Sequence, residues 1–141
     1  MKSRKLICFF LACLMLASCI TANATENDDD PASGNPNRYT GISTIAAAIS
    51  INALGVATCD GAVSLHNGYT VTATLSIQQR SNGRWNTLHS WSIPQNTGFN
   101  ASQHCGVVSG YKYRCQLETH VFDSDGHEVE SVTATSTSVQ Y

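Results

Sequence analysis

The sequence predicts an all-β sandwich, because three features of residues 38–141 are typical of that class. Apolar and polar residues alternate with period two along short segments rich in Val, Ile, Thr and aromatic residues. Turn-forming pairs such as Asn82-Gly83 and Asp125-Gly126 separate these segments. Tyr113 lies two residues before Cys115, which is the spacing of the tyrosine corner in immunoglobulin-type sandwiches. We therefore expect an immunoglobulin-like β-sandwich of about seven antiparallel strands in one domain, residues 38–141.

The first predicted strand lies in Gly41–Leu54, which is the most ambiguous segment of the domain. Its apolar residues fit helical spacing and strand alternation equally well. Ser, Thr, Ile and Asn are poor helix formers, and every later segment has the pattern of a strand. We therefore predict a strand rather than a helix here.

Four further strands are predicted before the tyrosine corner, at Gly55–Leu65, Tyr69–Gln79, Arg84–Ile93 and Phe99–Val107. In the third of these, period two places Trp85, Thr87, Trp91 and Ile93 on one face. Because Ile93 is apolar, we expect this face to point into the core, where one or both tryptophans would fill the space between the sheets. Tryptophans on an outer face could instead stack on sugar rings.

The last two predicted strands are Tyr111–Val121 and Glu128–Tyr141. The first of them has the most regular alternation in the chain. Asp125-Gly126 is expected to supply the positive φ angles of a tight hairpin between them. The final strand is rich in Ser and Thr and alternates weakly, so we expect a bulge or an edge strand there.

Three cysteines fall in the domain, Cys59, Cys105 and Cys115, each at an inward-facing position. Outside the cytoplasm buried cysteines usually pair, and three cannot all do so. A bridge between Cys59 and Cys115 would join the two sheets as in immunoglobulin domains. A bridge between Cys105 and Cys115 would close a short loop. Both pairings stay open, as do fully reduced and intermolecular states, and we expect the unpaired thiol to be a buried small hydrophobe.

The first 24 residues have the three parts of a secretory signal, a basic start, an apolar run and small residues. The apolar run is too short to span a bilayer. Ala22-Asn23-Ala24 fits signal peptidase cleavage, which would leave Thr25 as the new terminus. Residues 16–19 also match a bacterial lipobox, in which Cys19 would be lipidated. We favour a secreted protein that begins at Thr25, with lipid anchoring at the cell surface as the alternative.

An acidic segment, residues 25–37, follows the signal and contains Glu26 and three consecutive aspartates, Asp28 to Asp30. It has no large apolar residue, so we expect a disordered linker. Removal of the signal takes away three basic residues and leaves five basic against ten acidic residues. This balance disfavours nucleic acid and anionic lipid as partners, and a membrane would be a partner only through a lipidated Cys19.

Few basic residues are near neighbours in the sequence. Arg80 lies close to Arg84, and Lys112 lies close to Arg114. We expect both pairs to be ordinary solvated positions on strands.

The domain contains several short motifs of packing and turn residues: Gly55-x-Ala57-x-Cys59-x-Gly61-x-Val63, Gln79, Gly83-x-Trp85, Ser90-Trp91, Gly110-Tyr111-x-Tyr113-Arg114, Val121-Phe122 and Glu130-Ser131. In these motifs the chain resembles a group of small exported proteins of Gram-positive bacteria that have no assigned activity. The resemblance implies an immunoglobulin-like β-sandwich behind a signal peptide, without known catalytic residues. Cys105 and Cys115 depart from it, because they replace ordinary core positions.

Signals for catalysis are weak. The sequence contains no GxSxG, HExxH, CxxC or phosphate-binding glycine loop. The segment 123–127 resembles the start of a calcium loop, but it lies where a hairpin turn is required. Glu118, Glu128 and Glu130 lie on facing strands, where we expect a solvated polar face rather than a carboxylate pair for glycoside hydrolysis.

We therefore expect no enzymatic activity, no cofactor and no metal site. The predicted function is an interaction module that binds a protein or matrix component outside the cell. The alternative is a carbohydrate-binding module that uses Trp85 or Trp91.

Overall fold

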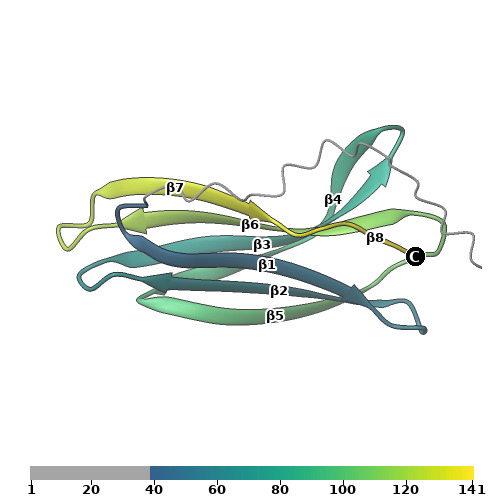
Figure 1. Cartoon of the computed structure of the whole chain (residues 1–141), viewed down its shortest axis with the longest axis horizontal. Coiled ribbons are helices and arrows are strands. Elements are labelled where there is room, and N and C mark those ends of the chain that lie inside the picture. The colour runs from purple at the N-terminus through teal and green to yellow at the C-terminus, as the bar shows by residue number, and fades with distance from the viewer. Residues whose placement is uncertain (1–38) are drawn as a thin grey trace, which may run out of the picture.

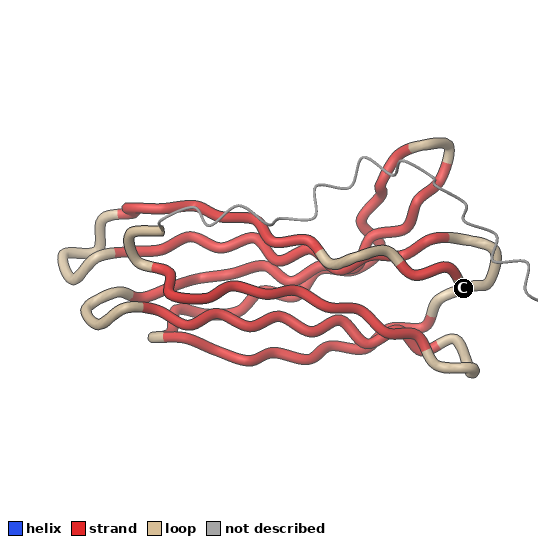
Figure 2. The backbone as a smooth tube through the Cα atoms, viewed as in Figure 1, coloured by secondary structure: helices blue, strands red, loops and turns tan. Residues whose placement is uncertain are grey.

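A computed structural model describes residues 39–141, and all regular structure in this range is β-strand (Figure 2). The predicted signal peptide, Cys19 and the acidic linker lie outside the described residues. In residues 39–141 no helix is long and apolar enough to cross a membrane.

The strands form two antiparallel sheets that pack face to face (Figure 1). The first sheet has the order β1-β2-β5, with β1 at Ile42–Ile51, β2 at Val56–Leu65 and β5 at Gly98–Gly106. The second has the order β4-β3-β6-β7, with β4 at Arg84–Asn96, β3 at Thr70–Ser81, β6 at Lys112–Phe122 and β7 at Glu128–Thr135. The short β8, Val139–Gln140, pairs with β6 beyond the end of β7. The predicted sandwich of seven main strands is therefore confirmed.

The first segment of the domain is a strand, as predicted. β1 pairs with β2 along its whole length, and Ile45 lies opposite the buried Val63. Along β1 half-buried residues alternate with exposed ones, because only one face of the strand meets the core. The helical alternative for this segment is therefore wrong.

The final segment contains both features expected of it. β7 lies at the edge of its sheet, and its register with β6 shifts at Val121–Phe122, as at a bulge. The strand is then interrupted before β8. In the interruption Ser136 is buried and exchanges two hydrogen bonds with Cys115 of β6. The Ser136 N–H donates to the Cys115 carbonyl at 2.9 Å, and the Ser136 hydroxyl accepts from the Cys115 N–H at 2.8 Å. These bonds satisfy backbone groups that a regular strand would pair.

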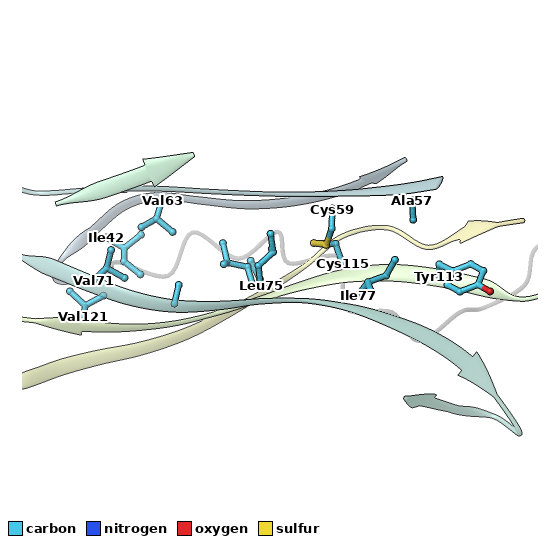
Figure 3. Close-up of a cluster of buried hydrophobic side chains, with 13 residues drawn as sticks. Ile42, Ala57, Cys59, Val63, Val71, Leu75, Ile77, Tyr113, Cys115 and Val121 are labelled. Carbon is cyan, nitrogen blue, oxygen red and sulfur yellow. A yellow bond between two sulfur atoms is a disulfide. The ribbon is translucent and has the colours of Figure 1, made fainter. Parts of the chain in front are cut away.

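The core is a single layer of apolar side chains between the sheets (Figure 3). Leu75 and Leu117 lie in its middle beside Gly61. Because Gly61 has no side chain, the two leucines can pack directly against its backbone. The Cys59–Cys115 disulfide joins β2 to β6 across the layer, with a Cα–Cα distance of 5.6 Å. Of the two pairings that the sequence left open, the structure contains this one, and Cys105 is free.

The bridge connects the second and sixth strands, as the conserved bridge of immunoglobulin domains does. β4 pairs with β3 at the edge of the second sheet, where variable-type immunoglobulin domains have an additional strand. The immunoglobulin-like strand arrangement and its bridge are therefore both present in this chain.

The tyrosine corner predicted from the spacing of Tyr113 and Cys115 is present. The Tyr113 ring is fully buried, and its hydroxyl donates to the Val108 carbonyl at 2.7 Å. The same hydroxyl accepts from the Gln79 amide at 3.1 Å. The corner therefore ties the start of β6 to the loop that precedes it and to β3.

Replacing Tyr113 with phenylalanine is expected to lower the free energy of unfolding by about 1–2 kcal/mol, because two hydrogen-bonding groups lose their partner in a half-buried site. Urea denaturation measures this change. Tyr111→Phe is the matched control, because Tyr111 is exposed. An unchanged denaturation midpoint for Tyr113→Phe would show that the corner contributes nothing.

The two hairpin turns of the second sheet differ from each other. Asn82 and Gly83 both have positive φ, 53° and 74°, as a two-residue hairpin turn requires. In the β6–β7 turn only Gly126 has positive φ, 82°, and the loop is closed by the bond from the Asp123 N–H to the His127 carbonyl. The expectation that Asp125 shares the positive φ is wrong, because the loop is longer than two residues.

Candidate functional site

The two tryptophans lie on opposite faces of β4. Trp91 pairs with Leu75, which points into the core, whereas Trp85 pairs with Arg80, which points outward. Between these pairs the register of β4 against β3 shifts, and Leu88 has no partner on β3. Such a bulge reverses the alternation of side chains along the strand. The prediction of one shared face is therefore wrong.

Trp91 lies on the inner face together with Ile93, and both are half-buried at the border of the core. The Trp91 ring also stacks on His89, with 5.8 Å between the ring centroids and 19° between the planes. Thr87 lies with Trp85 on the outer face. Trp91 therefore acts as a packing residue, and the two rings cannot form one stacking platform.

Trp85 lies on the outer face of the second sheet beneath two guanidinium groups. The Cζ atom of Arg114 lies 4.3 Å from the centre of the Trp85 ring, and that of Arg80 lies 5.8 Å from it. The Arg114 Nε–H donates to the Gln78 side chain at 2.8 Å, and the Gln78 amide donates to Gln116 at 3.0 Å. We call these five residues the Trp85 cluster.

The Trp85 cluster is held in place by its own contacts. Gln78 exposes only 8% of its surface although it lies on an outer face, because it is bonded to both Arg114 and Gln116. The cation–π contact with Trp85 and the charge-assisted hydrogen bond to Gln78 hold the guanidinium of Arg114 over the ring. The cluster therefore presents a preorganised aromatic and cationic surface.

The basic residues of the described chain gather at this end of the second sheet. They are Arg80, Arg84, Lys112 and Arg114, and we call their position the basic end. Arg80 lies directly opposite Lys112 in the β3–β6 register, and Arg114 lies two residues further along β6. The structure thus brings the two sequence pairs together at one end of the sheet, and all four residues keep at least partial exposure to solvent.

Acidic residues gather toward the opposite end of the same sheet, which we call the acidic end: Glu118, Asp123, Asp125, Glu128 and Glu130. The only other acidic residue in the described range, Asp60, lies on the outer face of the first sheet. Charge is therefore segregated along the length of the second sheet.

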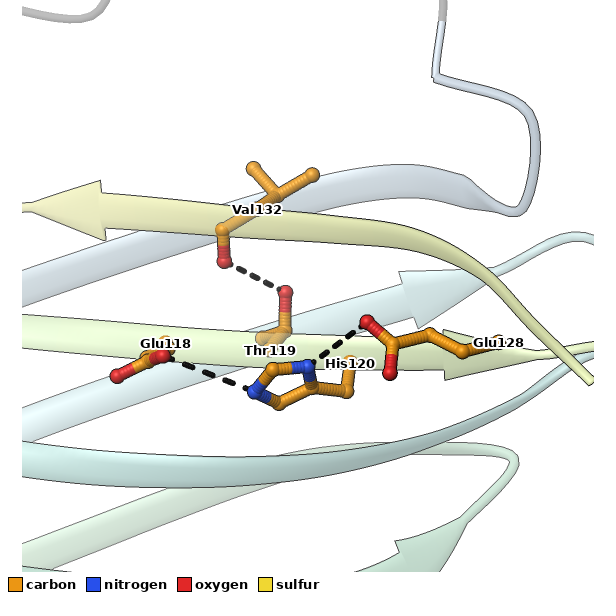
Figure 4. A network of polar contacts seen from close by, with 5 residues as sticks. All are labelled: Glu118, Thr119, His120, Glu128 and Val132. Carbon is orange, nitrogen blue, oxygen red and sulfur yellow. Dashed lines mark hydrogen bonds and ion pairs between the residues drawn. The ribbon is translucent and has the colours of Figure 1, made fainter.

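His120 lies between two carboxylates at the acidic end (Figure 4). Its Nδ1 lies 3.0 Å from Glu128, and its Nε2 lies 3.6 Å from Glu118. The hydrogen bond with Glu128 raises the pKa of His120 above its ordinary value, with a further contribution from the charges of both glutamates. The side chains of His120 and Glu128 are half-exposed, so their ion pair contributes less than about 1 kcal/mol to the free energy of unfolding.

The pKa of His120 is expected to fall in Glu128→Gln and to fall less in Glu118→Gln, because the bond to Glu128 is the larger cause of the shift. Since the pKa is raised in the folded chain, the ion pair stabilises the fold fully below the unfolded pKa, and this stabilisation is lost as the pH rises through the folded pKa. NMR titration of the His120 ring measures both effects. Equal His120 pKa values in the wild type and in both variants would contradict the conclusion that the two glutamates raise this pKa.

Glu130 does not join this group. Its carboxylate accepts hydrogen bonds from three successive backbone N–H groups at the start of the domain, those of Thr40, Gly41 and Ile42, at 3.1–3.3 Å. Glu130 therefore ties the edge strand β7 to the beginning of β1, and it serves the fold.

The segment 123–127 forms a turn. The Asp123 carboxylate accepts the N–H groups of Asp125 and His127 at 3.0 and 2.9 Å. The bond from His127 is the main reason that the pKa of Asp123 is lowered. The potential ligand atoms of Asp123, Asp125 and His127 lie within 4.8 Å of one another, but the Asp123 carboxylate already organises the hairpin.

Cys105 pairs with Ala57 on the inner face of β5 and is half-buried against the core. Burial raises the pKa of the Cys105 thiol. Because the thiolate is the nucleophile, a raised pKa lowers its reactivity. Cys105 therefore packs against the core as expected of the unpaired thiol, but it is half-buried rather than buried.

The outer face of the first sheet differs in character. It carries a shallow depression of about 380 Å³ over β1, β2 and β5, lined mostly by small side chains such as Ala46, Ala48 and Ala62, with Asp60 at its side. Among the described residues, no aromatic side chain lines this depression. The Trp85 cluster is therefore the better candidate for recognition.

Comparison with protein-family models and with curated proteins finds no match to this chain. The resemblance to small exported proteins thus stays a prediction.

Sequence reasoning named Trp85 and Trp91 but missed Arg80, Arg114 and Gln78, which belong to the Trp85 cluster. A signal was present in the alternation of Tyr111–Val121, which places Lys112, Arg114 and Gln116 on one outward face. The register that brings Arg80 and Gln78 beside them depends on the pairing of β3 with β6.

Proposed function

We propose that this chain is a non-catalytic, exported interaction module that binds a protein through the outer face of its second sheet, with the Trp85 cluster at the centre of the contact. The observation that carries the proposal is the Arg114 guanidinium 4.3 Å from the Trp85 ring, held in place by Gln78. Trp and Arg are enriched among the residues that dominate binding energy at protein interfaces, and preorganisation lowers the entropy lost on binding.

The predicted export of the chain supports a partner outside the cytoplasm. The Cys59–Cys115 disulfide is compatible with an extracellular location. A secretory signal with cleavage before Thr25 would release the domain, whereas lipidation of Cys19 would hold it at the cell surface. We place the module in the group of small exported sandwich proteins that the sequence motifs suggest.

The test is affinity capture from extracellular and cell-envelope extracts with the Thr25–Tyr141 chain, followed by a measured Kd for the captured protein. Trp85→Ala is expected to weaken binding at least about 30-fold, the equivalent of a 2 kcal/mol hot spot. Leu88→Ala is the matched control, because Leu88 is an exposed residue of the same strand outside the cluster. Equal affinities for both variants would contradict recognition through Trp85.

Carbohydrate binding is the second candidate, because Trp85 lies on an outer face rather than in the core. Sugar rings stack on aromatic faces, but the Trp85 ring is already in contact with the Arg114 guanidinium. Protein recognition therefore has the stronger support. Glycan-array hits that disappear in Trp85→Ala and persist in Leu88→Ala would favour the sugar.

A further inference from the structure

The two sheets have four edge strands, β1, β4, β5 and β7. An edge strand presents unpaired backbone groups to other chains, and proteins block such edges with charges, proline or bulges. β4 contains Pro94 and the bulge at Leu88, and β7 carries Glu128 and Glu130. β1 shifts its register near Ile42, where Glu130 binds its backbone. Three of the four edges therefore contain a feature that hinders the addition of a strand.

β5 has none of these features. Its nine residues, Gly98 to Gly106, pair with β2 in one unbroken register. The strand contains no proline and no Asp, Glu, Lys or Arg. It lies at the border of the first sheet, with β2 as its neighbour on the inner side (Figure 1). Among the described edge strands, β5 is therefore the one that can accept another strand over its whole length.

The inward side chains of β5 are incompletely covered. Phe99, Ala101 and Cys105 pack against the core but are only half-buried. Cys59, which lies at an inward position of the neighbouring β2, is fully buried. The half-buried residues thus leave apolar surface at the border of the core. A further strand beside β5 would remove this surface from water, which favours its addition.

We propose that two copies of this chain associate by antiparallel pairing of β5 with β5 of the second copy around a two-fold axis. In the register that uses all nine residues, Ser102 lies opposite Ser102 of the second copy. Gly98 then lies opposite Gly106, and Asn100 opposite His104. Such an interface is isologous, because the same surface of each copy meets itself.

The pattern of the strand suits this self-pairing. On the inward side, Phe99 of each copy lies opposite Cys105 of the other, so two half-exposed apolar side chains meet at both ends of the interface. On the outward side, the exposed Asn100 and His104 are both able to form hydrogen bonds. Because β5 carries no Asp, Glu, Lys or Arg, no fixed like charges oppose each other across the axis.

The proposal goes beyond the function suggested above and does not depend on it. β5 belongs to the first sheet, whereas the Trp85 cluster lies on the outer face of the second sheet. Pairing through β5 therefore leaves Trp85 accessible in each copy. A pair of copies would present two Trp85 clusters, which increases the avidity for a partner that offers two sites.

Sedimentation equilibrium of the Thr25–Tyr141 chain tests the association. We expect the wild type to form a dimer. The double variant Asn100→Lys, His104→Lys places like charges opposite each other at both ends of the interface, and we expect its Kd to be at least about 10-fold higher than that of the matched control. The control, Asn100→Lys, His104→Glu, places opposite charges there. Both variants lose the hydrogen bond between His104 and Thr58, so they differ only in the charge at position 104.

Oxidative cross-linking tests the register. In a Cys105→Ala chain, Ser102→Cys is expected to form an intermolecular disulfide, because directly opposed Cβ atoms lie about 5 Å apart. Asn100→Cys is the matched control, since Asn100 is equally an exposed residue of β5. In the proposed register the two copies of position 100 are offset by four residues, about 13 Å along the strand, which is too far for a disulfide.

Three results would overturn the proposal. The first is a wild-type chain that stays monomeric at about 1 mM. The second is equal association of the Lys, Lys and the Lys, Glu variants, because the contact would then lie elsewhere. The third is cross-linking of Asn100→Cys as fast as that of Ser102→Cys. Trp85→Ala should leave the association unchanged, so failure of this proposal and failure of the proposed function are measured separately.

Discussion

Replacing Cys59 and Cys115 together with alanine is expected to lower the free energy of unfolding by about 4 kcal/mol. The two cysteines are 56 residues apart, and the chain-entropy relation gives about 4 kcal/mol for a loop of that length. Both residues are fully buried between the sheets, so the loss of packed sulfur adds to the effect. Guanidinium denaturation of the oxidised wild type and of the double variant measures it.

Cys105→Ala is the matched control, because Cys105 is free and only half-buried. It is expected to change the free energy of unfolding by less than about 1.5 kcal/mol. If Cys105→Ala removed most of the stability and the Cys59, Cys115 double variant did not, the native bridge would involve Cys105. The intact mass of the exported chain before and after reduction then reports independently whether one bridge is present.

Period-two alternation was sufficient to predict the central strands. The predicted segments Gly55–Leu65 and Tyr69–Gln79 correspond closely to β2 and β3. Both strands lie in the interior of their sheets, so nearly all of their inward positions are apolar and the pattern is regular. The tyrosine corner was predictable for a related reason, since Tyr113 and Cys115 both point into the core.

The faces of β4 were not predictable in this way. β4 is an edge strand, and most of its residues are exposed. Neither face therefore has to be apolar, so the extra residue at Leu88 leaves no break in an apolar pattern. Because of the bulge, Trp85 faces outward, where it is a candidate for recognition, whereas Trp91 faces inward and packs against the core.

Two further features depend on which strands meet in space. Cys59 and Cys105 both point inward, but β2 lies in the middle of its sheet and β5 at its edge, and only Cys59 lies across from Cys115. The basic end joins Arg80 with Lys112, 32 residues apart in the sequence, through the β3–β6 register. Composition and local spacing contain neither the strand order nor this register.

Adding one methyl group at Gly61, in the variant Gly61→Ala, is expected to destabilise the domain by about 1–3 kcal/mol. A Cβ on Gly61 would lie 2.9 Å from Leu75 Cδ1 and 3.3 Å from Leu117 Cδ2. Both leucines are fully buried, so neither can move away without disturbing the close-packed layer. Gly61 is therefore required by the packing of the opposite sheet rather than by its backbone angles.

The reverse change at the same contact, Leu75→Ala, is expected to cost about 2–5 kcal/mol, because it leaves a cavity in the middle of the core. In the double variant Gly61→Ala, Leu75→Ala the added methyl group would occupy part of that cavity, and the clash with the leucine would be gone. We expect the double variant to be more stable than the sum of the single effects by at least about 1 kcal/mol. A double-mutant cycle by urea denaturation measures this coupling, with Ala62→Gly, Leu75→Ala as the control cycle, since Ala62 points outward from the same strand. Strict additivity in the Gly61 cycle would contradict the contact between the two sheets at this point.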